Sequence, residues 1–184
     1  MKYLKFFFVF FFSFSLNAKT LKLPEVISEY VCNTKFIMGA TVLETRTFQG
    51  KNKKRIDTVV DNIPQSVIID YKKQTASYIW PKTFSYLTIK LNPKTQKKLK
   101  EATKIVYFEK IKSDFIHGFE TDIFKIKLEL IDGTSEESIR WITKHGVTLK
   151  EKGTIVGSEG KIQFFSEFSN VKVFKQDKRL FEIP

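Results

Sequence analysis

The chain has 184 residues, 42% of them hydrophobic, a formal net charge of +12 and a single cysteine. This length fits one domain with a core of its own, and one cysteine excludes an internal disulfide bond. The charge comes mostly from lysine, whereas proteins that read bases use arginine for bidentate contacts, so we predict no nucleic-acid partner and leave attraction to anionic lipid head groups open.

Residues 1–18 have the pattern of a secretory signal peptide. Lys2 and Lys5 give a positively charged start, Phe6–Leu16 is apolar except for two serines, and Ala18 is a small residue at the cleavage position. A membrane anchor is the alternative reading, but a spanning helix needs about 20 apolar residues and this run is shorter. We therefore predict cleavage after Ala18, a periplasmic location and a single domain over residues 19–184.

Short stretches of strand-forming residues follow, with turn residues between them. A helical start over Pro24–Val31 is an alternative for the first of them. Cys32 falls within that first strand, where we expect it to be buried as a small apolar residue. Short strands at this spacing indicate an all-β sheet or barrel. The predicted strands are Glu25–Met38, Ala40–Phe48, Arg55–Asp61, Gln65–Tyr71, Thr75–Trp80 and Phe84–Leu91.

One helix is predicted in the middle of the chain, over Pro93–Lys104. Asn92 can cap its start, and proline fits the first helical position. Its apolar stripe is thin, with Leu99 as the main inward residue, and its outer surface is rich in lysine. We predict that this helix lies across an edge or mouth of the sheet as a lid, packed weakly enough to open.

The most regular stretch is Gly118–Lys150, which reads as an antiparallel meander. Phe124, Ile126 and Leu128 alternate with Lys125 and Lys127, as expected of a half-buried strand. Turns are predicted at Asp132-Gly133 and His145-Gly146. The strands predicted in this half of the chain are Ile105–Ile116, the alternating segment, Ser138–Lys144, Val147–Lys152, Thr154–Glu159 and Lys161–Phe174.

The sequence carries no catalytic or metal-binding motif. His117 and His145 each precede a glycine at a predicted turn and lack the spacing of a zinc site. Ser158 does not lie in the GxSxG pattern of a nucleophile elbow. Glu136 and Glu137 are neighbours that point apart in a strand, so we interpret them as solubilising residues at a hairpin tip. We predict no enzyme activity, no metal and no cofactor.

Five segments carry a resemblance to a known family: NKKRID, VIIDYKKQTASYIWP, HGFETDIFKIKLE, RWITKHGVTLKEKG and FSNVKVFKQDKRLFEIP. In order and spacing they resemble the LolA/LolB-like superfamily of periplasmic lipoprotein-sorting and related exported proteins, over roughly Phe36 to Pro184. The resemblance implies a mainly β fold, a curved antiparallel β-barrel that does not close, with a helical lid over a hydrophobic cavity. The sorting carriers begin with a clear amphipathic helix and have more than one lid helix, so this chain is more similar to the uncharacterised exported relatives.

The resemblance also implies a function. It predicts a periplasmic, monomeric binding or carrier protein for acyl chains of lipids or lipoproteins, with envelope membrane proteins as a further class of partner. The alternative is an envelope protein-interaction module whose aromatic residues fill a solid core and whose exposed sheet edge pairs with a partner strand. The predicted cavity-lining residues are Phe36, Met38, Tyr78, Trp80, Phe84, Tyr86, Leu99, Phe124, Trp141 and Phe165.

Overall fold

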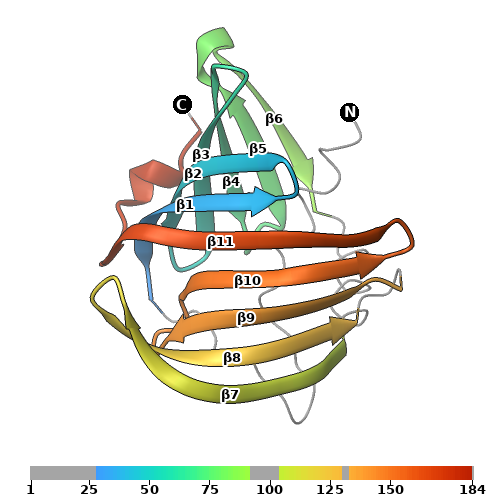
Figure 1. Cartoon of the computed structure of the whole chain (residues 1–184). Coiled ribbons are helices and arrows are strands. Elements are labelled where there is room, and N and C mark those ends of the chain that lie inside the picture. The colour runs from blue at the N-terminus through green and yellow to red at the C-terminus, as the bar shows by residue number, and fades with distance from the viewer. Residues whose placement is uncertain (1–27, 92–103, 130–132, 184) are drawn as a thin grey trace.

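The structure is a computed structural model that describes residues 28–91, 104–129 and 133–183. These residues form one antiparallel sheet of eleven strands and two short 3-10 helices (Figure 1). The predicted signal peptide and the predicted lid helix with Leu99 lie outside the described residues. Lys104, predicted as the last residue of that helix, is instead the first residue of a strand.

The first six strands form one meander, in which each strand pairs with the next. Within it, η1 (Pro81–Thr83) lies between the last two strands. The turn Asp61-Asn62 shows the local chemistry of these hairpins, because both residues have positive φ, which Asp and Asn tolerate and which suits a two-residue hairpin. The strands are β1 (Tyr30–Met38), β2 (Thr41–Gln49), β3 (Lys53–Val60), β4 (Ile63–Asp70), β5 (Thr75–Trp80) and β6 (Ser85–Lys90).

The last five strands form a second meander, which ends in η2 (Lys178–Phe181). The two segments Val147–Lys152 and Thr154–Glu159, predicted as separate strands, form a single strand that continues through Gly153. The strands are β7 (Lys104–Ile116), β8 (Phe119–Glu129), β9 (Ser135–Thr143), β10 (Thr148–Gly157) and β11 (Gly160–Val173).

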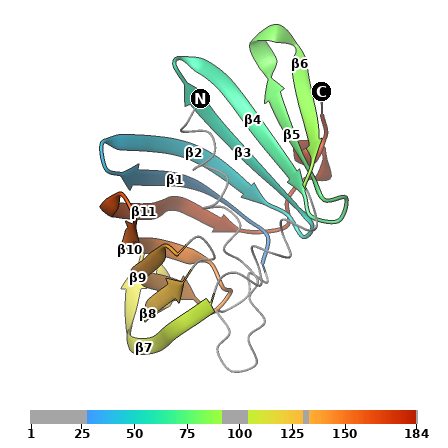
Figure 2. The ribbon, with the colours of Figure 1, turned by 90° about the vertical axis from the view of Figure 1, so that its right-hand side faces the viewer.

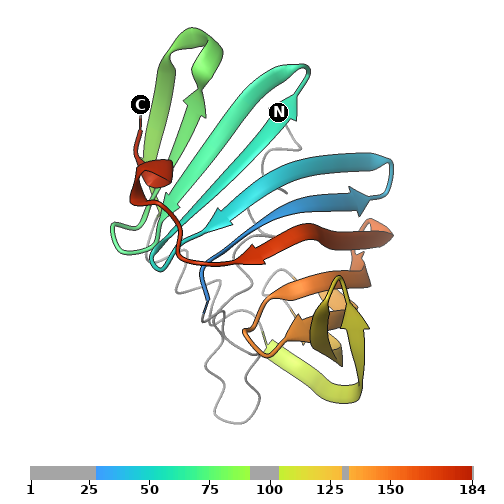
Figure 3. The same ribbon diagram turned by 90° about the vertical axis from the view of Figure 1, so that its left-hand side faces the viewer.

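The two meanders join along a single ladder between β1 and β11. The strand order is β6-β5-β4-β3-β2-β1-β11-β10-β9-β8-β7, so β6 and β7 lie at opposite ends of the sheet. Within the described residues these two strands do not pair with each other, and the sheet does not close. The predicted fold class, a curved antiparallel sheet that forms an unclosed barrel, is confirmed (Figures 2 and 3).

The strand register assigns side chains to the two faces of the sheet, because directly paired residues point the same way. One row of successive partners runs from β8 to β1 and consists of Phe124, Arg140, Glu151, Ser166 and Phe36. We call the face with this row the inner face. A buried cluster on it extends from Tyr30 and Cys32 of β1 to Phe119 of β8, four positions away in the strand order.

The opposite, outer face is covered in part by the C-terminal segment. Phe181 of η2 packs against Val31, Phe48 and Ile68, which come from β1, β2 and β4. The Arg55 guanidinium donates a hydrogen bond of 3.0 Å from Nη1 to the carbonyl oxygen of Leu180. The end of the chain is therefore held on the outer face by both apolar burial and a charge-assisted hydrogen bond.

A candidate binding face

Apolar clusters occupy both arms of the inner face. On the β7–β9 arm, Phe124, Ile126 and Leu128 pack with Ile105 and Ile142, and the alternation predicted for this strand is confirmed. The rings of Phe108 and Phe124 stack with centroids 4.7 Å apart. The five aliphatic and aromatic side chains of this cluster are at most 9% exposed, so they form a packed apolar layer on this arm.

The other arm carries a second apolar cluster, on β4 and β5. Its buried members are Ile69, Ala76 and Leu91, and Tyr78 packs against them. The rings of Tyr78 and Trp80 stack with centroids 6.5 Å apart. The inner face therefore has an apolar arm at each end of the sheet.

Polar side chains separate the two arms. Thr34, Thr45 and Thr47 are buried on β1 and β2, and the Thr45 hydroxyl has no hydrogen-bond partner among the described residues. Lys54 of β3 is buried on the same face, and burial lowers the pKa of its ammonium to about 8. The inner face between the two arms therefore carries buried polar groups and a cation, beside the apolar cluster of Tyr30 and Cys32.

Three charged side chains form a triad on β9 and β10. Arg140 lies between two carboxylates, with Nη2 2.8 Å from Glu136 Oε1 and Nε 2.5 Å from Glu151 Oε1. The side chains of Arg140, Glu136 and Glu151 are only 4%, 8% and 12% exposed. The contact with Glu136 is a hydrogen bond, whereas the contact with Glu151 is an ion pair off the hydrogen-bonding direction.

Two carboxylates thus share one guanidinium in this triad. Burial raises the pKa of Glu151, and the attraction of Arg140 only partly opposes this. Ser138, which lies between Glu136 and Arg140 on the same side of β9, donates a hydrogen bond of 2.9 Å to Glu136. A buried, hydrogen-bonded triad of this kind fixes the local geometry of the inner face, and removing its cation would leave charges without compensation.

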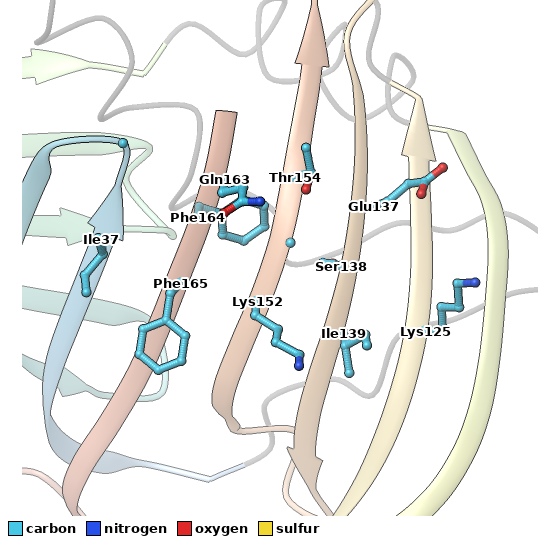
Figure 4. Close-up of a pocket in the computed structure, with 12 residues that line it drawn as sticks. Ile37, Lys125, Glu137, Ser138, Ile139, Lys152, Thr154, Gln163, Phe164 and Phe165 are labelled. Carbon is cyan, nitrogen blue, oxygen red and sulfur yellow. The ribbon is translucent and has the colours of Figure 1, made fainter. Parts of the chain in front are cut away.

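The outer face has a shallow groove of about 660 Å³ over β1 and β8–β11 (Figure 4). One cross-strand row runs along it and consists of Ile37, Phe165, Lys152, Ile139 and Lys125. The row contains three apolar and two basic residues, and Figure 4 shows these side chains side by side on neighbouring strands.

Cationic groups lie over aromatic rings next to this groove. Lys150 Nζ is 5.4 Å from the centroid of the Trp141 ring and 5.6 Å from that of Phe165. Lys152 Nζ also lies over Trp141, at 5.9 Å. The outer face is therefore basic and aromatic, in contrast to the apolar arms and buried triad of the inner face.

Comparison with known proteins identifies the fold. No family model and no curated protein matches the chain. The solved structure of MucB superimposes with a TM-score of 0.54 and 11% identity, covering 87% of this chain and 59% of that chain. An uncharacterised conserved protein from Thermus thermophilus gives a TM-score of 0.54 and 7% identity over 86% and 87% of the two chains. The chain has a LolA-like fold.

A complex of MucA and MucB from Pseudomonas aeruginosa is a further structural neighbour of this LolA-like chain. It superimposes with a TM-score of 0.53 and 9% identity, and covers 85% of this chain and 56% of that chain. The chain thus spans less than two thirds of the length of the MucB chains. At these identities the likeness concerns the fold.

The LolA-like sheet places the predicted cavity residues on different faces. Phe36, Met38, Tyr78, Trp80 and Phe124 lie on the inner face, by the register of their strands. Phe84 lies in the turn after η1 and Leu99 lies outside the described residues. Contact of any of these residues with a ligand stays a prediction. The outer face carries Tyr86, Trp141 and Phe165.

The triad is not among the features predicted from the sequence, and the predicted role of one of its members differs from the structure. Glu136 and Glu137 do point apart, as predicted, but only Glu137 is a solvated residue, paired with Lys127 at 2.8 Å. Glu136 faces inward and binds Arg140, so its interpretation as a solubilising residue is wrong. The available signal was the spacing of Glu136, Ser138 and Arg140, which places three polar residues on one side of a strand.

The described ranges contain no group of three or more His, Cys, Asp or Glu residues that could hold a metal ion. They also contain no helix long and apolar enough to cross a membrane. His117 adopts a positive φ next to Gly118, and its Nε2 lies 3.2 Å from Glu167, as fits a turn residue. Cys32 is buried, as predicted, and only 1% exposed.

Proposed function

We propose that the protein is an exported, non-catalytic binding protein that holds acyl chains of lipids or lipoproteins against the inner face of its half-barrel. The observation that carries this proposal is the pair of apolar clusters on the two arms of an unclosed sheet. Burial of hydrocarbon contributes about 25 cal/mol per Å² without directional requirements, so we expect loose selectivity for chain type. The signal-peptide pattern of residues 1–18 supports a periplasmic location.

The buried polar groups between the two arms of the inner face support an amphiphilic ligand rather than a pure hydrocarbon. The Thr45 hydroxyl can donate to an ester or carboxyl oxygen, and the Lys54 ammonium can attract an anionic head group. Chains lying along either apolar arm would then place a polar head between the arms. Selectivity in this proposal concerns the head group more than the chain.

The test compares ligand content and uptake in a matched pair of variants. Phe36 and Phe165 are both half-buried aromatic residues of the adjacent strands β1 and β11, but they lie on opposite faces. Lipid extraction with mass spectrometry and uptake of a fluorescent fatty acid are measured for the native protein, Phe36→Ser and Phe165→Ser. We expect uptake to fall several-fold in Phe36→Ser alone. A native protein without extracted lipid and without uptake would count decisively against the proposal.

A second candidate function is pairing of an envelope protein with the sheet edge. The observation that favours it is β6, an edge strand whose six residues are all exposed, and an extended partner can add to such an edge. MucB, a neighbour in fold, is solved in complex with MucA. Two results together would favour this function over the first. Proline substitutions along β6 would release a bound protein, and the native protein would take up no lipid.

A further inference from the structure

Exposed apolar side chains gather at one corner of the molecule, where two hairpins end. Six of them, contributed by the ends of β3–β4 and β5–β6 and lying on both faces of the sheet, form what we call the tip patch. The two turns contact each other, since Lys82 Nζ lies 3.5 Å from the carbonyl oxygen of Asn62. Figure 1 shows both turns at the upper end of the sheet, and Figures 2 and 3 show the ends of the two hairpins apart. The tip patch consists of Val59, Val60, Ile63, Phe84, Tyr86 and Leu87.

Phe84 is the most exposed large apolar residue of the described chain, at 98%. Its φ is 49°, in the left-handed region that bulky residues rarely adopt. The folded chain therefore holds an aromatic ring in solvent by means of an unfavourable backbone conformation. Neither property stabilises the isolated protein, and such outliers concentrate at functional sites.

We propose that the tip patch inserts into the interface of an anionic lipid bilayer. The patch lies at the ends of two hairpins, so it can enter a surface that yields to it, as the head-group region of a bilayer does. Phe and Tyr rings partition into this region, and Lys82 can extend its stem along the apolar surface while its ammonium stays with the head groups. The net charge is +12 for the full chain and, without Lys2 and Lys5 (30 − 20), +10 after the predicted cleavage, and it favours approach to anionic lipids.

The two tryptophans of the chain allow this site to be distinguished from the outer groove. Trp80 immediately precedes η1 at the base of the tip patch, and Trp141 lies beside Lys150 and Lys152 on the outer face. Trp141→Phe leaves Trp80 as the only fluorophore, and Trp80→Phe leaves Trp141. Each protein is mixed with vesicles of phosphatidylcholine and phosphatidylglycerol whose acyl chains are brominated, because bromine quenches indole emission on contact.

The expected result is quenching in Trp141→Phe and none in Trp80→Phe. The matched variants are Phe84→Asn, which suits the left-handed backbone, and Phe115→Asn, which removes another exposed aromatic residue far along β7. We expect Phe84→Asn to lower the vesicle partition coefficient about ten-fold, equivalent to about 1.4 kcal/mol, and to leave thermal unfolding unchanged or raised. Phe84→Trp should retain binding, and Phe115→Asn should have no effect.

Three outcomes would overturn the proposal. Quenching of Trp141 emission in the absence of any quenching of Trp80 emission would assign membrane contact to the outer face. Binding that is equal in Phe84→Asn and the native protein would exclude the tip patch. Absence of binding to any vesicle would leave a protein as the only partner for this surface. None of these results bears on uptake of fatty acid by the inner face, which is measured separately.

Discussion

Removal of the buried guanidinium is the sharpest perturbation that the structure offers. Arg140→Met replaces the cation with an apolar side chain of similar length and leaves the carboxylates of Glu136 and Glu151 without their ion partner. Breaking a buried ion network by removing one partner costs about 3–5 kcal/mol, because the remaining charges stay desolvated. A domain of this size loses about 2–4 °C per kcal/mol, so we expect a fall in Tm of about 6–20 °C at neutral pH.

The pH dependence of the stability loss in Arg140→Met follows from the buried carboxyl groups. Burial already raises the pKa of Glu151 in the native protein, and loss of Arg140 removes the attraction that opposes it. A carboxyl with a raised pKa binds its proton more tightly in the folded state, so stability falls as pH rises above the unfolded pKa of about 4.3. The destabilisation by Arg140→Met should therefore be greatest at neutral pH and shrink towards about pH 4.

The assay is thermal unfolding of the native protein, Arg140→Met and a control, followed by circular dichroism across this pH range. Arg46→Met is the matched control, because Arg46 is exposed and its contact is with the Phe48 ring, 5.1 Å from its guanidinium carbon. We expect the control to stay within about 0.5 kcal/mol of the native protein. A Tm for Arg140→Met equal to that of Arg46→Met, or a loss that grows on acidification, would refute the reasoning.

Three further predictions concern single sites. A methyl group on Gly153 would lie 2.5 Å from the carbonyl oxygen of Glu137 and 2.7 Å from the Phe164 ring. Gly153→Ala should therefore lower the free energy of unfolding in urea by about 1–3 kcal/mol, and a urea midpoint equal to that of the native protein would contradict this. Burial raises the pKa of Cys32 to about 11, so a thiol reagent at pH 8 should label this residue only as the protein unfolds. Rapid labelling of the folded protein would contradict this prediction, because it would show that the thiol is accessible. Phe181→Ala should cost about 3 kcal/mol and expose the C-terminal segment to limited proteolysis, whereas unchanged resistance would show that η2 is held by other contacts.

The sequence predicts strands well wherever local pattern decides them. Thr75–Trp80 was predicted with the bounds that the structure has, because turn residues flank it on both sides. The alternation of Phe124, Ile126 and Leu128 with lysine also identified the buried side of β8. These features depend on neighbours in sequence, which is the range over which periodicity carries information.

Features that depend on distant pairing were not predictable in the same way. Alternation shows that Trp141 and Phe165 each point away from their sequence neighbours, but it does not show which side of the sheet is the inner one. Both faces carry large apolar residues, so their aromatic character did not decide this. The position of Glu151 opposite Arg140 depends on the register between β9 and β10, which a strand pattern alone does not fix.

The ladder between β1 and β11 has a consequence for the order in which the chain can fold. Tyr30 pairs with Val173, so β1 keeps one edge without a partner until the last strand has been synthesised. A rearranged gene that placed β7–β11 before β1–β6 would make every neighbouring pair of strands consecutive, and a chain with such local contacts should fold faster. In the native order, by contrast, the first meander has an open edge of the kind that invites aggregation until the second meander has been synthesised.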